Sequence, residues 1–417
     1  MRYNEIEKCR VCKGSNLETI IDIGLFYPTS FFPRDKNVSM EKEPLQLALC
    51  MECGLVQLNH SFETETLYGS NYGYRSGLNQ SMVKHLEEIT LHARSLVNLQ
   101  KGELVLDIGS NDGTLLKNFT DESLNLCGID PTGKKFANYY SPEVNLIPNF
   151  FSRDLIKAEY GEKKAKIITS IAMFYDLEDP IEFASGICDV LDDEGVWIFE
   201  QSYFPSMLDA NSYDTICQEH LEYYSLSQID WILSRVGLKI CDIKLTSANG
   251  GSFMVTAAKN KSNVKVNSEK IGYFLSQEKS RKLDQVETYS EFNSNIQKHR
   301  DEVKQFISSV KASGKKMFGY GASTKGNVIL QYCDLDSSDF PFILEVNEDK
   351  FGAHTPGTNI PIISEQEGRS QNPDYLFVLP WHFKENIIKR EKEFLNSGGK
   401  LVFPLPKLEI IGKEAIS

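Results

Sequence analysis

The segment from Leu104 to Thr114, LVLDIGSNDGT, decides the fold class of this chain. An apolar strand runs into Asp107, and Gly109 and Gly113 then form a turn before a helix that we expect to begin near Thr114. Glycines at such a turn let the backbone come close to a ligand. A strand, a glycine turn and a helix in this order predict a Rossmann-like cofactor site.

Strands and helices alternate on both sides of this segment. Between residues 102 and 259, the strands LVLDIG, LCGID, KIITSIA, VWIFEQS and SFMVTAA are separated by helical segments, which predicts a doubly wound α/β domain. Apolar residues at helical spacing predict a leading helix within residues 71–100 and one or two bridging helices within residues 267–313. The later strands KKMFGYG, FPFILEV, DYLFVLP and KLVFPLP predict a second, smaller Rossmann-like unit.

Acidic side chains stand at the carboxyl ends of two of these strands. Asp107 is placed to accept hydrogen bonds from a cationic group, such as the amino group of S-adenosylmethionine (SAM). Asp130 follows the next strand about twenty residues after the glycine turn, where a carboxylate can accept both hydroxyls of an adenosine ribose. Asn111 takes the middle position of the methyltransferase pattern GxGxG, and asparagine tolerates positive φ. Because the turn lacks the GxGxxG of NAD sites, we favour SAM over NAD. The residues that we expect to bind it are Asp107, Gly109, Ser110, Asn111, Gly113, Asp130, Pro131 and Ser76.

Four cysteines near the N-terminus form two CxxC pairs, Cys9 with Cys12 and Cys50 with Cys53. Such pairs can supply the four thiolates of a tetrahedral, structural zinc site, although redox pairs or unconnected thiols are the alternatives. Metal analysis would decide between them. The regions that we predict are a zinc-binding module (1–70), a SAM-binding Rossmann domain (71–262), a helical linker (263–313) and a C-terminal Rossmann-like unit (314–417).

Composition limits the class of protein. The chain has 417 residues, 41% apolar and 25% charged, which indicates a globular protein of more than one domain. Its formal net charge of -13, without a long run of Lys and Arg, argues against a nucleic-acid partner. Neither a signal peptide nor an apolar run of about 18 residues is evident. We therefore expect a cytoplasmic monomer or small homo-oligomer that acts on a small molecule and not at a membrane.

Two further segments carry polar clusters after predicted strands. The first, residues 200–225, brings Glu219 and His220 close together, which suits an active site or, alternatively, a solvated charge pair at the start of a surface helix. The second, KKMFGYGASTKGN (residues 315–327), places Ser323, Thr324 and Lys325 at the start of a helix, where an anion is favoured. Its glycines could instead serve packing alone. We expect Trp381 and His382 to border the same cleft.

These motifs together carry a family resemblance over nearly the whole length. They are the CxxC pairs, YxYxSG (Tyr72, Tyr74, Ser76, Gly77), LDIGSNDGT, YDTIxxEH (Tyr213 to His220), and GYGASTKGN with PGTNIPI. The chain resembles the sugar C-methyltransferases that act on nucleotide-linked 4-keto-6-deoxyhexoses. The resemblance implies that His220 removes the proton beside the ketone, that Glu219 supports it, and that Ser323, Thr324 and Lys325 bind a diphosphate.

Two positions depart from that family. Cys217 stands where a tyrosine is common and Gln218 where a histidine is common, so we expect Tyr74 or Tyr72 to donate to the developing oxyanion. Three aromatic side chains, Tyr175, Tyr224 and Trp381, are further candidates for substrate contact. The alternatives are SAM-dependent O- or N-methylation of a small polar substrate, which needs no enolate, and an inactive zinc-ribbon and Rossmann binding protein.

Overall fold

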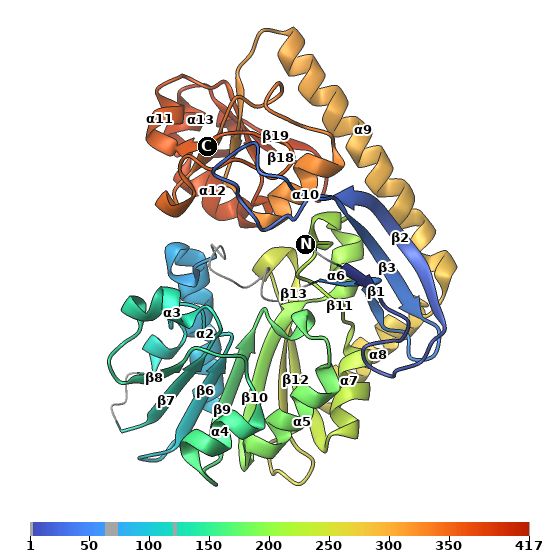
Figure 1. Cartoon of the computed structure of the whole chain (residues 1–417), viewed down its shortest axis with the longest axis vertical. Helices are drawn as coiled ribbons and strands as arrows, with labels where there is room; N and C mark the ends of the chain where they lie inside the picture. Colours follow the sequence, from blue (N-terminus) through green and yellow to red (C-terminus); the bar gives the residue numbers. More distant parts are fainter. Residues whose placement is uncertain (1–2, 63–73, 120–122, 417) are drawn as a thin grey trace.

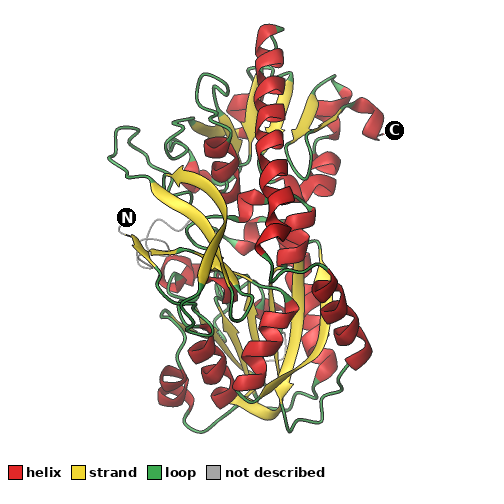
Figure 2. Ribbon diagram, turned by 90° about the vertical axis from the view of Figure 1, so that its right-hand side faces the viewer, coloured by secondary structure: helices red, strands yellow, loops and turns green. Residues whose placement is uncertain are grey.

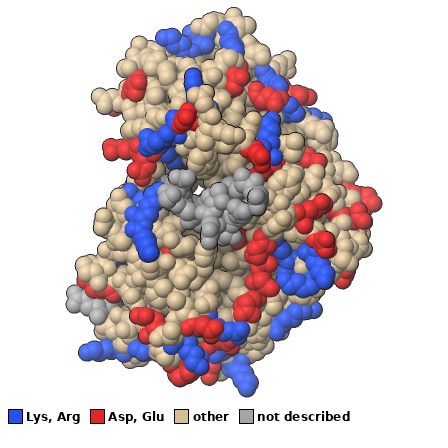
Figure 3. Space-filling view, viewed as in Figure 1, with Lys and Arg blue, Asp and Glu red and all other residues tan. Residues whose placement is uncertain are grey.

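The computed structural model describes residues 3–62, 74–119 and 123–416. Figure 1 shows a large α/β domain below, a smaller α/β domain above, and an N-terminal β-hairpin with the long helix α9 along one side of both. No helix within the described ranges is both long and apolar enough to traverse a lipid bilayer. On the face seen in Figure 3, described acidic and basic side chains are interspersed.

The large domain is built on a sheet of seven described strands. In spatial order they are β12 (Leu238–Thr246), β13 (Ser252–Lys259), β10 (Leu191–Ser202), β9 (Ala165–Ile171), β6 (Leu104–Ile108), β7 (Asn125–Ile129) and β8 (Val144–Ile147). Only β13 runs antiparallel to both of its neighbours, β10 and β12. Because β6 pairs with β7 on one side and β9 on the other, the strand order reverses there, and ligands of such sheets bind beyond the carboxyl ends at that point.

Helices cover both faces of this sheet, as successive side chains of β6 show. Val105 packs with α2 (Gln80–Leu96) in one core cluster. Leu104 and Leu106 pack in another cluster with α4 (Arg153–Tyr160), α5 (Pro180–Val190) and α7 (Leu226–Arg235). The predicted doubly wound architecture is confirmed, with β8 and β12 as strands that the sequence pattern did not indicate.

The prediction of a helix beginning near Thr114 is wrong. The described chain forms only the 3-10 turn η2 (Leu116–Asn118), and Phe119 leaves the helical region at φ -90° and ψ 83°. The hydroxyl and the backbone N–H of Thr114 both bond to Asp112, so the chain is held in a local turn that competes with a helix.

The N-terminal module contains an antiparallel sheet in the order β11 (Glu222–Tyr223), β4 (Val56–Leu58), β3 (Glu43–Cys50) and β2 (Leu17–Phe26). Strands β1 (Tyr3–Glu5) and β5 (His60–Phe62) pair separately. The edge strand β11 belongs to the predicted catalytic segment, far along the chain. The N-terminal sheet therefore incorporates the backbone that directly follows His220.

The linker consists of two described helices, α8 (Ser268–Ser280) and α9 (Ser290–Ala312), as the apolar spacing predicted. Helix α9 packs Phe292, Ile296 and Val303 into a core cluster that also holds residues of β2, β3 and the C-terminal sheet. Figure 2 shows this helix running beside the hairpin and the C-terminal domain. The N-terminal hairpin and the C-terminal domain thus share one core.

The C-terminal domain has a sheet of six described strands with the same kind of reversal. In spatial order they are β16 (Ile362–Ser364), β15 (Ile343–Glu345), β14 (Met317–Tyr320), β17 (Tyr375–Val378), β18 (Lys400–Phe403) and the antiparallel β19 (Glu409–Ile411). Its described α-helices are α10 (Thr324–Tyr332), α11 (Glu365–Arg369), α12 (Lys384–Arg390) and α13 (Lys392–Asn396). The reversal at β14 places the start of α10 at the edge that faces the large domain (Figure 1).

Candidate active site and zinc centre

The four predicted metal ligands converge on one point. Their sulfur atoms all lie within 4.8 Å of one another, with 3.6 Å between Cys9 and Cys53 and 3.5 Å between Cys12 and Cys50. Sulfurs of a tetrahedral zinc site with Zn–S bonds of about 2.3 Å lie roughly 3.8 Å apart, so the cluster fits that ion. All four cysteines are free thiols. A site closed by four sulfurs has no open position for water, and its role is structural.

Predicted cofactor, catalytic and anion-binding residues, though not all of them, meet at one cavity of about 290 Å³. Its wall combines parts of all three modules. The predicted residues that line it are Asp107, Gly109, Ser110, Tyr74, Ser76, Tyr175, Glu219, His220, Ser323, Thr324 and Lys325. Ser30 and Phe32 of the N-terminal module close the wall between the two α/β domains.

The glycine turn after β6 has the backbone that the sequence predicted. Gly109, Asn111 and Gly113 have φ of 73°, 52° and 73°, and asparagine takes the left-handed conformation in place of glycine. Asp107 at the end of β6 accepts a hydrogen bond from Thr169 Oγ1 at 2.7 Å. Burial raises the pKa of Asp107 to about 7. A buried carboxyl beside an open turn suits a cationic ligand.

Asp130 ties two turns together at the end of β7. Its Oδ2 accepts from Asn111 N at 2.8 Å, and its Oδ1 accepts from Thr132 N at 2.7 Å. Asn111, Gly113, Asp130 and Pro131 do not line the cavity itself. Asn111 and Gly113 belong to the turn itself, and Asp130 has its carboxylate already engaged by backbone N–H groups.

Residues 74–77 lie over this turn. Asn111 Nδ2 donates to Tyr74 O at 3.1 Å, and Ser76 N donates to Asn111 Oδ1 at 2.9 Å. Gly77 N donates to Asp112 Oδ2 at 3.0 Å. These bonds bring Tyr74 and Ser76 to the cavity, whereas Tyr72 lies outside the described residues.

His220 is held in one tautomer. Its Nδ1 lies 2.8 Å from Thr215 O, and because a carbonyl only accepts, Nδ1 carries the proton and Nε2 keeps a lone pair. Burial, followed by the charge of Lys325, lowers the pKa of His220 to about 3, so the imidazole is neutral near pH 7. Its ring meets that of Tyr175 edge to face, with centroids 4.4 Å apart. Burial also raises the pKa of Glu219 to about 7.

The segment before α10 presents polar groups to the same cavity. Ser323 caps the helix by accepting from Gly326 N at 3.0 Å, and Lys325 Nζ donates to Asn249 O of the large domain at 2.7 Å. A Cβ on Gly319 would lie 2.1 Å from Ile343 Cδ1, and one on Gly321 2.7 Å from Pro380 Cδ. The two glycines thus serve close packing, while the residues after them face the cavity.

Three family models match consecutive parts of the chain. Residues 9–68 match "Putative zinc binding domain", residues 83–243 "Methyltransferase domain" and residues 247–406 "C-methyltransferase C-terminal domain". The C-methyltransferase NovU of Streptomyces niveus is 29% identical over 418 residues, covering 98% of this chain and 98% of that protein. The chain is therefore similar to the C-methyltransferases over nearly its whole length. It is a SAM-dependent methyltransferase with a structural zinc site.

Solved methyltransferase structures are more distant. The plantazolicin methyltransferase BpumL, solved with a triazolic desmethylPZN analog and SAH, is 16% identical with a TM-score of 0.36, over 44% of this chain and 88% of that one. The magnesium protoporphyrin IX methyltransferase of Synechocystis PCC 6803, with bound SAH, is 16% identical with a TM-score of 0.33, also over 44% and 88%. The assignment as a methyltransferase rests on the family models and the full-length relative.

Two aromatic residues expected at the substrate lie elsewhere in this methyltransferase. Tyr224 is fully buried and stacks on Phe174 with centroids 5.5 Å apart, because its ring packs in the same core cluster of the large domain. Trp381 is 6% exposed, and its Nε1 donates to Asp214 Oδ2 at 2.7 Å. Neither lines the cavity, whereas His382 does.

Sequence reasoning missed several groups in the wall of the cavity. Glu200, at the end of β10, is 2% exposed and binds His85 Nε2 of α2 at 2.7 Å. Burial opposes protonation of His85, but this hydrogen bond raises its pKa. Glu200 ends a strand of the same parallel sheet as Asp107, so its position could have been inferred. Ser30 and Phe32 carried no comparable signal.

Proposed function

We propose that this methyltransferase methylates the carbon beside the ketone of a nucleotide-linked 4-keto-6-deoxy sugar, with His220 as the base. The observation that carries the proposal is the orientation of His220. Its Nδ1 is engaged by Thr215 O, so the unprotonated Nε2 is the atom available to a C–H group in the cavity. The lowered pKa of His220 keeps Nε2 unprotonated at physiological pH, as a base requires.

The proton transfer separates charge in a way that the site can tolerate. When Nε2 takes the proton, an imidazolium forms beside an enolate, so the pair is neutral overall. The pKa of about 3 in the free enzyme means that Nε2 of His220 carries no proton before the substrate arrives. Thr215 O keeps the ring oriented before and after the transfer. SAM supplies the electrophilic methyl group that the enolate carbon attacks.

Donors for the enolate oxygen must come from the cavity wall. Cys217, at the position where the family resemblance leads one to expect a tyrosine, is fully buried and is not part of the wall. Tyr74 does line the cavity, from the segment that lies over the SAM turn. Its hydroxyl is therefore our candidate for the oxyanion donor.

The residues that line the cavity support the proposed substrate class. Asp107 and Gly109 mark the SAM end, and Ser323, Thr324 and Lys325 mark the other. Hydroxyl groups and an ammonium at a helix N-terminus favour a diphosphate. A sugar between these ends would place its ring at His220.

Solvent exchange tests the base directly. A panel of nucleotide-linked 4-keto-6-deoxy sugars is incubated with the enzyme in D2O without SAM, and deuterium beside the ketone is followed by NMR. We expect rapid exchange with the wild type and a loss of at least 100-fold in His220→Asn, because general base catalysis contributes about 10² to 10⁴. Calorimetry checks that His220→Asn still binds SAM.

Two results would contradict the proposal. Exchange at the wild-type rate in His220→Asn removes this residue from the mechanism. Methyl transfer from labelled SAM to a hydroxyl or amine, without exchange at carbon, identifies an O- or N-methyltransferase instead.

A further inference from the structure

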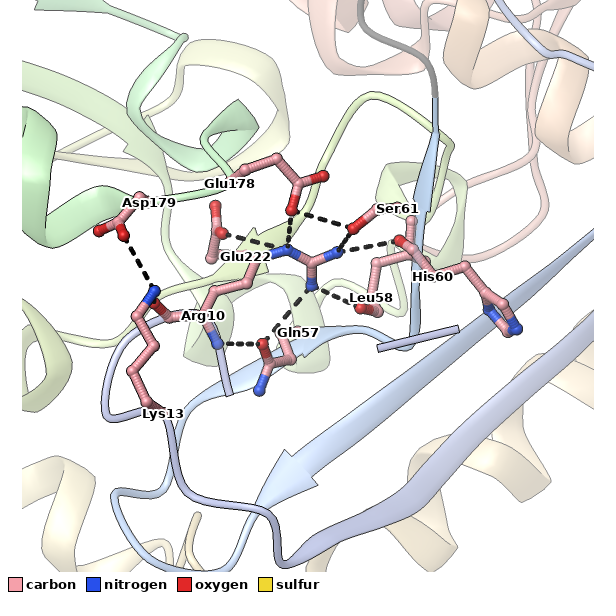
Figure 4. Close-up of polar contacts among 9 residues, drawn as sticks. All are labelled: Arg10, Lys13, Gln57, Leu58, His60, Ser61, Glu178, Asp179 and Glu222. Atoms are coloured by element: carbon pink, nitrogen blue, oxygen red, sulfur yellow. Dashed lines mark hydrogen bonds and ion pairs between the residues drawn. The ribbon is translucent and has the colours of Figure 1, made fainter. Parts of the chain in front are cut away.

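Arg10 lies between two zinc ligands, Cys9 and Cys12, and its side chain is buried in the protein, with 2% exposed. Its guanidinium donates to backbone and side-chain acceptors of the N-terminal module (Figure 4). Nη1 donates to Leu58 O at 2.6 Å, and Nη2 donates to His60 O at 3.0 Å and to Ser61 Oγ at 2.9 Å. The backbone N–H of Arg10 donates to Gln57 Oε1 at 3.0 Å.

The same guanidinium also reaches two carboxylates of the methyltransferase domain. Nε lies 3.2 Å from Glu178 Oε2 and 3.8 Å from Glu222 Oε1. The side chain of Glu222 is fully buried, whereas that of Glu178 is 48% exposed. Burial raises the pKa of Glu222, and the positive charge of Arg10 opposes this rise.

These carboxylates belong to the two segments that form the catalytic wall. Glu222 stands two residues after His220, and Glu178 stands three residues after Tyr175. The segments are also joined directly, since Leu221 N donates to Tyr175 O at 2.8 Å. One guanidinium therefore contacts both of the segments whose His220 and Tyr175 rings meet, with centroids 4.4 Å apart.

Backbone pairing carries the connection to the zinc module. Leu58 N donates to Leu221 O at 2.7 Å, and Glu222 pairs with Gln57 across β11 and β4. Arg10 Nη1 binds the carbonyl of that same Leu58. The position of Arg10 is in turn fixed by the CxxC turn, where Cys9 N donates to Gly14 O and Lys13 N donates to Cys9 O.

We propose that Arg10 is a positioning residue: from the zinc-bound turn it fixes the backbone that orients His220 and Tyr175. The zinc module then does more than close the cavity, because its metal site also fixes the orientation of His220. The importance of this position for methyl transfer rests on the proposed role of His220. Plain packing would not require a guanidinium that binds both segments, since an apolar side chain would fill the same space.

The test compares Arg10→Met, Arg10→Lys and the control Lys13→Met. Lys13 stands in the same turn, forms an ion pair with Asp179 and donates to Arg10 O at 2.9 Å, but its side chain is 53% exposed, so it is the matched variant whose contacts are open to solvent. The measurements are zinc content, SAM affinity by calorimetry, kcat and KM, and the imidazole ¹⁵N signals of histidine-labelled enzyme. His220→Asn assigns the signal of His220.

We expect both Arg10 variants to retain zinc and SAM affinity while kcat falls at least 10-fold, because small displacements of reacting groups are costly. The ¹⁵N signals of His220 should shift as its bond to Thr215 O loosens. Lysine should not restore them, since a single ammonium cannot replace both Nε beside the two carboxylates and the Nη groups that bind the N-terminal module. Lys13→Met should match the wild type in all four measurements.

Wild-type kcat together with unshifted His220 signals in folded Arg10→Lys would overturn the proposal. If Arg10→Met does not fold, the test uses Glu178→Gln in its place, because the half-exposed side chain of Glu178 can lose its charge without leaving a cavity in the core. Unshifted His220 signals in that variant and in Arg10→Lys would likewise count against positioning. Shifted signals with unchanged kcat would support positioning by Arg10 and would instead exclude His220 as the base, so the two proposals fail separately.

Discussion

Two buried carboxyl groups at the cavity have raised pKa values. Asp107 stands beside the glycine turn, and Glu219 stands beside His220. Burial raises the pKa of each to about 7, so each gains or loses a proton near physiological pH. A cationic ligand at the turn would favour the ionised form of Asp107.

The affinity for SAM should therefore depend on pH through Asp107. Its carboxylate must be ionised to accept from the SAM ammonium, and below pH 7 binding must first release a proton. With a pKa of about 7, SAM should bind about tenfold more weakly at pH 6 than at pH 8. Calorimetry at both values measures this. Asp107→Asn should bind SAM weakly at both pH values, whereas Glu219→Gln should keep the pH dependence of the wild type. A wild-type SAM affinity that does not depend on pH would exclude Asp107 as the group that binds the SAM ammonium.

At the scale of elements, the sequence predicted the strands, turns and helices that have a periodic apolar pattern or a recognisable motif. The strand and turn of LVLDIGSNDGT, the CxxC pairs and the start of α10 were all visible. Strand β11 was not, because two residues, Glu222 and Tyr223, carry no period, and their partner β4 lies far away in the chain. The expected helix after Gly113 gave way to local bonds of Asp112. Long-range pairing and side-chain competition decided these places.

The glycine turn offers a test of how tightly this element is built. A Cβ on Gly113 would lie 2.8 Å from Tyr140 Cδ1, and the hydroxyl of Tyr140 donates to Asn111 O at 2.9 Å. Gly113→Ala combines a φ of 73° with that clash, so we expect a loss of about 1 to 3 kcal/mol in unfolding free energy and weaker SAM binding. Gly314→Ala, with φ 70° and open space around its Cβ, isolates the backbone effect. If Gly113→Ala and Gly314→Ala lose the same unfolding free energy in thermal assays and the same SAM affinity in calorimetry, the turn at Gly113 is not crowded.

At the scale of the whole molecule, the cavity exists because three modules are packed together. The core shared by the hairpin, α9 and the C-terminal sheet fixes that domain against the N-terminal module. Lys325 Nζ then reaches Asn249 O across the boundary between the two α/β domains. The sequence indicated each ligand-binding segment separately, but Ser30 and Phe32 enter the wall only through this packing, which no local pattern encodes.

This arrangement predicts that substrate and SAM affinities can be separated by a variant in the C-terminal domain. Lys325→Met removes the ammonium expected to bind a diphosphate, and losing a charge-assisted hydrogen bond of about 1.5 to 3 kcal/mol should weaken nucleoside diphosphate binding at least tenfold. SAM affinity should remain unchanged, because Asp107 and Gly109 belong to the other domain. Lys384→Met, which removes an ion pair with Glu409 whose side chains are 32% and 37% exposed, is the control. Calorimetric titration with a nucleoside diphosphate and with SAM measures both constants. Equal weakening of both ligands in Lys325→Met would indicate that this lysine holds the domains together and does not bind the diphosphate.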